Sequence, residues 1–499
     1  MRSSTLVLAA VALAAVAGSA WWLVGRKSEP RWNVVVLTLD TTRADFLGCY
    51  GRPGDPTPNL DALALEGTRF DRAIATASVT PVSHASILTG LDNHEHGVRV
   101  LAGMCGYKLK PDVPSLATIL KAEGFATAAV HSAFPVSAYY GFDHGFDIFE
   151  SFEGAIQKSQ AGTMTWPLTQ LQRRSDDTTR IVIEKLAQLE QPFFLWVHYW
   201  DPHDDVLLPP AEEIPASVPR GANGRPLASR ELYAAEVDYL DSQIGRLFDD
   251  LKASGEWEHT IVVVVSDHGE GLGDHGWQFH RILYQEQIRV PLLVRIPGLV
   301  SAPSVAATVS TTDIAPTVLD YLGLRGPRAM SGRSLRPLLE GRDDAPRSAF
   351  ADQINGYDLN AAMLAKRPLD DFLYAVVDQG WKLIWRPLHP EHSELYNLDE
   401  DPGELRNRLT TDPGEVLRLQ KLLARHGGWV TAPCQTPDDP NMDLAAALQI
   451  LENLGYAGGS AAVEPRWGFA CPENPSLVVA DPLELDCEDG FLLVPSAVR

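Results

Sequence analysis

Short apolar runs alternate with longer segments of helical spacing through the middle of the chain. The runs are rich in branched and aromatic side chains, which favours buried strands. They cover residues 33–39, 125–130, 193–199, 260–266 and 291–296. The clearest helical pattern covers 231–254, where apolar residues recur every three or four positions until Gly255, and a second follows over 301–324. This alternation predicts an α/β fold with a mostly parallel central sheet flanked by helices.

The remaining segments divide the chain into four parts. At 499 residues it is longer than one hydrophobic core comfortably supports. Residues 32–345 hold the strand and helix patterns of a main domain. Residues 346–430 have the pattern of short strands and turns, which predicts a small C-terminal subdomain. The Pro- and Asp-rich tail, 431–499, matches no recognisable pattern.

Residues 1–31 have the pattern of a targeting segment. An uncharged run over 5–24 lies between Arg2 and the basic pair Arg26 and Lys27. Twenty helical residues span about 30 Å, the thickness of a bilayer core. The small residues 18–20 suit cleavage, but the apolar run continues beyond them, so a signal anchor and a cleaved signal peptide both remain open. Either one predicts export, with the protein membrane-anchored or free in the periplasm or extracellular space.

Charge and cysteine content narrow the classes of partner. Lys and Arg number 42 against 65 Asp and Glu, a net charge of −23, which disfavours nucleic acid and anionic membrane surfaces. An anionic substrate then needs local positive charge, which a bound metal ion can supply. The five cysteines are too scattered for a zinc site, although one bridge is possible among the three in the last 66 residues. The cysteines are Cys49, Cys105, Cys434, Cys471 and Cys487.

Acidic and histidine residues directly follow two of the predicted strands. Asp40 comes after the run 33–39, and Asp267 and His268 come after 260–266. In open α/β sheets, ligand groups gather outside the carboxyl ends of the strands. Carboxylate with neutral imidazole suits zinc, manganese or iron. An aspartate at this point can also simply cap the next turn, so the residues alone leave both interpretations open.

The segment 77–90 reads ASVTPVSHASILTG. It resembles the signature of the sulfatase family in the alkaline phosphatase superfamily, Cys-x-Pro-Ser-Arg-Ala-Ser-x-Leu-Thr-Gly. Thr80 stands in the cysteine position, Val82 replaces proline and His84 replaces arginine. With the Asp-His-Gly segment at 267–269 and the sequence at 394–404, the resemblance covers about 32–410. Sulfatases convert that cysteine to formylglycine, which threonine cannot become, but related phosphodiesterases and phosphotransferases attack with a metal-held threonine hydroxyl.

The resemblance implies an alkaline-phosphatase-like fold with a small C-terminal antiparallel subdomain and one divalent metal ion, such as calcium, manganese or zinc. The implied metal ligands are Asp40, Thr80, Asp267 and His268. Sulfatases usually carry two acidic residues where this chain has Asp40 and Thr41, so one oxygen ligand is weakened or lost. The second site of two-metal phosphatases needs an aspartate with a histidine four residues later, and the segment 198–203 lacks this spacing.

The same resemblance implies roles for three further histidines. His203, in an Asp-Pro-His segment, matches a histidine that contacts sulfuryl or phosphoryl oxygens. His280 stands where relatives carry a lysine shortly before Leu-Tyr, so both are candidates for substrate binding and leaving-group protonation. His84 is a candidate for holding Thr80 or its adduct. Helix-start signals after Thr80 would place it at a helix N-terminus, where backbone amides favour anionic oxygens.

These observations predict an exported, metal-dependent hydrolase in which Thr80 attacks phosphorus or sulfur. The substrate would be a small-molecule, glycan or lipid ester. A phosphodiester or phosphonate is favoured over a sulfate ester, and a singly charged ester over a monoester dianion, because Thr41, His84 and His280 replace one acidic and two basic groups. Two other classes stay open: a membrane-anchored phosphoryl transferase, and a catalytically silent binding protein that keeps the fold.

Overall fold

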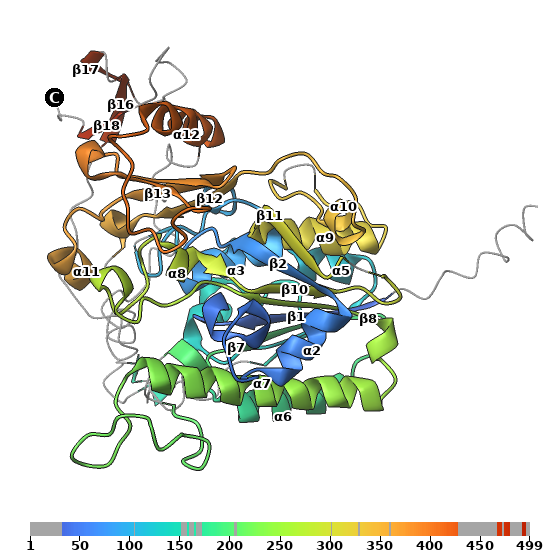
Figure 1. The fold of residues 1–499 in the computed structure, drawn as a ribbon. Coiled ribbons are helices and arrows are strands. Elements are labelled where there is room, and N and C mark those ends of the chain that lie inside the picture. Colours follow the sequence, from blue (N-terminus) through green and yellow to red (C-terminus); the bar gives the residue numbers. More distant parts are fainter. Residues whose placement is uncertain are drawn as a thin grey trace, which may run out of the picture.

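A computed structural model describes most of the chain between residues 32 and 427 (Figure 1). The gaps are 104, 151–156, 159–163, 166–171, 204–206, 301, 328–329 and 359–360, and beyond 427 only three short strands between 467 and 495 are described. The predicted targeting segment 1–31 and most of the predicted tail lie outside these residues. Within them, no helix combines the length and the apolar character needed to cross a bilayer.

The main domain is built on a twisted sheet with the strand order β11-β2-β10-β8-β1-β7-β3-β4, and β9 also pairs with β2. Neighbours β1, β7, β8 and β3 pair in parallel, whereas β10 runs antiparallel to β8 and β2. The predicted mostly parallel sheet is therefore confirmed. The strands are β1 (Asn33–Leu39), β2 (Thr68–Ile74), β3 (Ala126–Val130), β4 (Ile148–Glu150), β7 (Phe193–Tyr199), β8 (Thr260–Ser266), β9 (Arg289–Val290), β10 (Leu292–Arg295) and β11 (Ser304–Ser310).

Helices cover both faces of this sheet, and alternate strand residues supply the two cores. Val34 and Val36 pack with α3, α5 and α9, while Val35 and Leu37 pack with α2, α6 and α7 on the opposite face (Figure 1). Strands buried on both faces have continuous apolar runs, which is why the sequence predicted them. The helices are α2 (Pro58–Glu66), α3 (Thr80–Thr89), α4 (Asn93–His96), α5 (Leu116–Ala122), α6 (Ser175–Leu186), α7 (Arg230–Ala253), α8 (Gln285–Ile288), α9 (Ile314–Tyr321), α10 (Arg336–Leu339), α11 (Ala361–Lys366) and α12 (Pro413–His426).

The predicted helix over 301–324 is wrong in its first half. Residues Ser304–Ser310 form β11, which pairs in parallel with β2, and the helix α9 begins only at Ile314. The segment contains Val305, Thr308 and Val309, which are β-branched residues that suit a strand. Pairing with β2, a strand that the sequence analysis did not predict, therefore decides the conformation.

A small antiparallel sheet follows the main domain, as predicted for the C-terminal subdomain. Its strands are β12 (Ala349–Gln353), β13 (Leu373–Asp378), β14 (Trp381–Trp385) and β15 (Glu394–Asn397), in that order, and α12 packs on it (Figure 1). Its apolar side chains share a core with Trp277, Ile282, Leu283 and Tyr284 of the main domain. The subdomain thus supports the loop that carries His280.

Candidate active site

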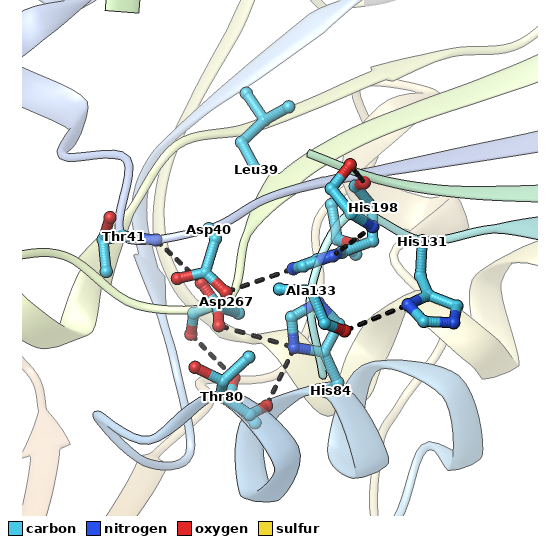
Figure 2. A network of polar contacts seen from close by, with 12 residues as sticks. Leu39, Asp40, Thr41, Thr80, His84, His131, Ala133, His198 and Asp267 are labelled. Atoms are coloured by element: carbon cyan, nitrogen blue, oxygen red, sulfur yellow. Dashed lines mark hydrogen bonds and ion pairs between the residues drawn. The ribbon is translucent and has the colours of Figure 1, made fainter. Parts of the chain in front are cut away.

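The central side chains of the site lie at the carboxyl ends of three adjacent strands. Because β1 lies between β7 and β8 in parallel register, their carboxyl ends meet at one edge of the sheet. Asp40 follows β1, His198 precedes the last residue of β7, and Asp267 follows β8. All three side chains are fully buried, and Figure 2 shows them converging above the first turn of α3.

The two oxygens of Asp267 have different surroundings. Oδ1 accepts hydrogen bonds from the backbone N–H groups of Thr41 (3.1 Å) and His268 (2.8 Å). No hydrogen-bond donor among the described residues reaches Oδ2, which lies 3.4 Å from His268 Nε2 and 3.4 Å from His84 Nδ1. Burial raises the pKa of this carboxyl well above its usual range. A buried carboxylate oxygen without a donor is a position that a cation would stabilise.

The hydrogen bonds of His268 determine which ring nitrogen is available. Nδ1 lies 3.0 Å from the carbonyl oxygen of Gly269, so it carries the hydrogen and donates it. Nε2 therefore presents its lone pair toward Asp267 and lies 3.4 Å from Thr80 Oγ1. Burial, aided by the positive charge of Arg281, lowers the pKa of His268 to about 4, so the ring is neutral at pH 7. Metal-binding histidines characteristically donate their other N–H in this way.

Thr80 is the first residue of α3, as the helix-start signals predicted. Val79 precedes the helix in an extended conformation, Pro81 lies in its first turn, and Gly90 ends it at φ 69°. Ser83 Oγ donates to the backbone oxygen of Asp267 at 2.7 Å, which ties this helix to the end of β8. Thr80 is buried, with 1% of the residue exposed, and its hydroxyl lies where the helix N-terminus favours negative charge.

The residues fit a divalent cation. Asp40, Asp267 and His268 each offer a ligand atom, and these atoms lie within 4.8 Å of one another. Carboxylate oxygens and imidazole nitrogen suit zinc or manganese, and calcium prefers oxygen alone. The Thr41 side chain takes no part here, since only its backbone N–H reaches Asp267.

Aromatic and imidazole rings form a row beside Thr80. His280 lies 4.7 Å from the His268 ring and 5.5 Å from the His203 ring, measured between centroids, and His203 stacks on Trp200 at 3.7 Å. His280 Nδ1 donates to the backbone oxygen of Ser78 at 2.9 Å, which leaves its Nε2 as an acceptor. Burial lowers the pKa of both His203 and His280 well below the usual range. His203 is half-buried, whereas His268 and His280 are buried.

His84 lies one helical turn beyond Thr80. Its Nδ1 donates to the backbone oxygen of Thr80 at 2.8 Å, and its ring is 4.9 Å from that of His198. Burial lowers the pKa of His84 to about 3, so it carries no charge where the signature has arginine. The contact to Thr80 is therefore to the backbone of the residue and leaves the hydroxyl free of His84.

The structure brings all the predicted site residues to one edge of the sheet. They are Asp40, Thr80, His84, His203, Asp267, His268 and His280. Sequence reasoning missed His198, whose Nε2 lies 3.1 Å from Asp40 Oδ2. The available signal was its place one residue before the end of the buried strand β7.

Arg281 is a second residue that the sequence analysis missed. Its side chain is 5% exposed, its Nη1 lies 3.0 Å from Asp358 Oδ2, and its backbone is left-handed at φ 84°. Asn355 Nδ2 donates to the Arg281 backbone oxygen at 3.1 Å, so the C-terminal subdomain holds this strained residue in place. Its charge contributes to the lowered pKa of His268 and His280. A fixed positive charge is thus present beside the site.

The mostly parallel sheet with flanking helices is a fold that this chain shares with a solved phosphonate monoester hydrolase. The chain belongs to the sulfatase family of the alkaline phosphatase superfamily, because the Sulfatase family profile matches residues 32–324. The profile of the N-sulphoglucosamine sulphohydrolase C-terminal region matches 273–425. Enzymes of this kind act on sulfuric or phosphoric ester bonds, and so does this one.

The alignments with named relatives and solved structures cover most of this chain and most of each of those proteins. The N-acetylglucosamine-6-O-sulfatase of Bacteroides thetaiotaomicron is 26% identical, with 81% of this chain and 86% of that protein covered. A structure of a protein in complex with its substrate D-glucosamine-2-N,6-O-disulfate superposes with a TM-score of 0.64 at 23% identity, covering 80% of this chain and 97% of that one. The phosphonate monoester hydrolase of Agrobacterium radiobacter gives 0.62 at 22%, covering 79% and 96%.

Proposed function

We propose that this chain is a metal-dependent ester hydrolase in which the hydroxyl of Thr80 attacks phosphorus or sulfur. The observation that carries the proposal is the position of Thr80 Oγ1, at the start of α3 and 3.4 Å from His268 Nε2, beside the Asp40–Asp267–His268 group. A hydroxyl at this point can form a covalent intermediate and divide a difficult displacement into two easier steps.

Asp40, Asp267 and His268 would hold the cation, and a cation there would lower the pKa of a neighbouring hydroxyl and neutralise charge on the ester. Ser83 keeps α3 against β8 through its bond to the Asp267 backbone, so the hydroxyl and the ligand group keep one geometry. The N-terminal amides of α3 favour negative charge on the attacking oxygen. The chain itself therefore orients the nucleophile before any substrate binds.

His203 and His280 would bind the non-bridging oxygens of the ester or protonate the leaving group. His280 is the inner member of the row, close to His268, and His203 is the half-buried outer member. Burial keeps both rings neutral at pH 7, so neither is a fixed charge. Because His280 Nδ1 donates to Ser78, its Nε2 must first take up a proton, such as the one that Thr80 releases, before it can bind an ester oxygen or protonate the leaving group. Arg281, held by Asp358, is a fixed cation beside the site.

This charge balance favours an ester with one negative charge. One divalent ion balances the carboxylates of Asp40 and Asp267, the Arg281 guanidinium is balanced by Asp358, and His84 and His280 add no charge, so the site has no surplus of positive charge for a dianion. A monoester dianion is better matched by two metal ions. We therefore expect phosphodiesters, phosphonate monoesters or sulfate esters as substrates, and, by analogy with the named relatives, a sugar or another small molecule as the esterified group.

The test is kinetics on chelator-treated protein reloaded with calcium, manganese or zinc. Aryl sulfate, phosphate monoester, phosphodiester and phosphonate monoester substrates are compared, with the bound metal measured by elemental analysis. We expect one equivalent of metal per chain and the lowest turnover for the phosphate monoester. Turnover without metal, two tightly held equivalents, or a preference for the phosphate monoester at every pH would contradict the proposal.

Thr80→Ala and Thr80→Ser separate the role of the hydroxyl from that of the fold. The alanine variant should lose several orders of magnitude in turnover, because loss of a nucleophile removes most covalent catalysis. The serine variant keeps the hydroxyl at the start of α3 and should keep measurable activity. Metal content should stay near one equivalent in both, since Asp40, Asp267 and His268 remain. Wild-type turnover in the alanine variant would refute the assignment.

We further propose that the chain acts outside the cytoplasm. Two observations support export: the uncharged run over 5–24, and the disulfide bond of Cys105, a type of bond that persists in oxidising compartments. Cys49 is free. Fractionation of cells that express the full chain, with N-terminal sequencing of the product, tests export and distinguishes an anchor from a cleaved signal. Recovery of the intact chain in the cytoplasmic fraction would overturn it.

A further inference from the structure

His198 is fully buried at the end of β7, between the metal-ligand group and the neighbouring strand β3. Its two ring nitrogens have different partners. Nδ1 lies 3.3 Å from the backbone N–H of Ser132, and Nε2 lies 3.1 Å from Asp40 Oδ2. Figure 2 shows the ring aimed at the Asp40 carboxylate from the side opposite Thr41.

The Ser132 contact fixes the tautomer of His198. A backbone N–H can only donate, so Nδ1 must accept and carries no hydrogen. In a neutral imidazole the single hydrogen is then on Nε2, where it donates to Asp40 Oδ2. The same contact excludes His198 as a metal ligand through Nε2, because a lone pair at Nε2 would require a hydrogen at Nδ1 facing the Ser132 N–H.

The surroundings hold this arrangement rigidly. Ser132 Oγ donates to the backbone oxygen of His198 at 2.6 Å and lies 2.6 Å from Thr178 Oγ1 of α6. The backbone N–H of Asp40 donates to the backbone oxygen of Tyr199 at 2.8 Å, which fixes Asp40 against the end of β7. Both ends of the His198–Asp40 hydrogen bond are thus attached to paired strands.

We propose that His198 is a positioning residue for Asp40: its Nε2–H orients the carboxylate so that the oxygen it does not engage faces the metal ion. This rests on the proposed metal site. The Asp40–Thr41 segment has only one carboxylate. The orientation of this carboxylate therefore affects metal binding more than it would in a segment with two acidic residues. Hydrogen-bonding partners of this kind typically account for 10- to 100-fold in metal affinity.

Two substitutions at the same position separate the hydrogen bond from the bulk of the ring. The amide of His198→Gln can place an N–H near the position of Nε2, and so retain a donor to Asp40. The shorter His198→Asn can keep an acceptor for Ser132 but leaves no donor at that distance. His131→Asn is the matched control, since His131 is an equally buried histidine at the end of β3 that bonds the Ala133 backbone oxygen at 3.0 Å.

The dissociation constants of Zn²⁺ and Mn²⁺ are measured on the purified full chain by chelator competition, with circular dichroism as the check on folding. We expect His198→Asn to weaken binding about 10- to 100-fold, and His198→Gln and His131→Asn by less than about tenfold. Equal affinity in His198→Asn and wild type would overturn the inference, as would equal losses in the Asn and Gln variants. If the wild type binds neither ion, the proposed metal site itself fails, and the inference with it.

Tautomer state gives a second readout that does not depend on metal. In protein labelled with [¹⁵N]histidine, the His198 signals are assigned by their disappearance in His198→Asn. Long-range ¹⁵N–¹H correlations should show hydrogen on Nε2 and an unprotonated Nδ1, with or without Zn²⁺. Hydrogen on Nδ1 in either state would refute the assignment.

Discussion

Asp267→Asn separates metal binding from folding. In the wild type, Oδ1 accepts two backbone N–H groups, and Oδ2 is the oxygen without a donor among the described residues. An asparagine in the same rotamer keeps a carbonyl oxygen for the two backbone donors. It places an NH₂ group where the metal-binding oxygen lies, beside His268 Nε2. We expect this variant to fold and to bind no metal.

The burial of the Asp267 carboxylate determines the expected difference in the free energy of unfolding between the two proteins. Without a cation, burial raises the pKa of Asp267, and taking up a proton at pH 7 costs a carboxyl of ordinary pKa 3.8 about 4 kcal/mol. This is the most the buried charge can cost, because the group would protonate instead. Asparagine avoids that cost, and one of its N–H groups can donate to the lone pair of His268 Nε2, but each N–H left without a partner costs about 1–3 kcal/mol. Metal-free Asp267→Asn should therefore be at most about 3 kcal/mol more stable than metal-free wild type.

With bound metal, we expect the wild type to be more stable than Asp267→Asn. At a free metal concentration 1,000 times the dissociation constant, binding stabilises the folded wild type by about 4 kcal/mol and leaves the variant unchanged. The assay is urea unfolding at pH 7, once with excess chelator and once with Zn²⁺. An equal response of both proteins to Zn²⁺, or a metal-free variant several kcal/mol less stable than wild type, would refute the reasoning.

Asp241→Asn is the matched control. This carboxylate is also buried, but both of its oxygens accept hydrogen bonds: Oδ1 from Leu60 N at 2.8 Å, and Oδ2 from Asn59 N at 3.1 Å and Nδ2 at 2.8 Å. An amide would turn N–H groups toward these donors. The substitution should therefore destabilise the protein by about 1–3 kcal/mol, to the same extent with and without Zn²⁺.

Two further predictions concern acid and charge. Burial lowers the pKa of His84 and His131 to about 3, below the ordinary 6.5, so the unfolded chain binds more protons than the folded chain at these two positions. Their contribution to the free energy of unfolding in urea should be fully present above pH 6.5 and fall toward pH 3. Over this range the wild type should therefore lose more stability than His131→Asn, and equal losses would contradict the burial of a neutral ring at that position. Arg281→Met should raise KM for a singly charged ester about tenfold by removing 1–2 kcal/mol of attraction. Arg281→Lys should retain much of that attraction. Arg347 is a matched control, because its buried guanidinium pairs with Asp313, and Arg347→Met should leave KM unchanged. Equal KM in all three variants would exclude Arg281 from substrate binding.

Local pattern alone located the elements that carry the site. The continuous branched runs of β1, β7 and β8 identify strands that are buried on both faces, and an acidic residue after such a strand necessarily lies at the edge of the sheet where ligands bind. This is why Asp40, Asp267 and His268 could be named from sequence. The family signature identified Thr80 as the residue in the nucleophile position. The helix-start signals after it predicted that Thr80 lies at a helix N-terminus.

Tertiary structure decided which of these groups meet and in what state. The partner of Asp40 is His198, 158 residues away in the chain, and only the pairing of β1 with β7 brings them together. Strand β11 was misjudged for the same reason, because its pairing with β2 overrides its local spacing. Arg281 contributes charge to the site because Asp358 and Asn355 of the C-terminal subdomain hold it there. Hydrogen-bond partners, tautomers and pKa values depend on groups distant in the chain, and a local pattern carries no information about them.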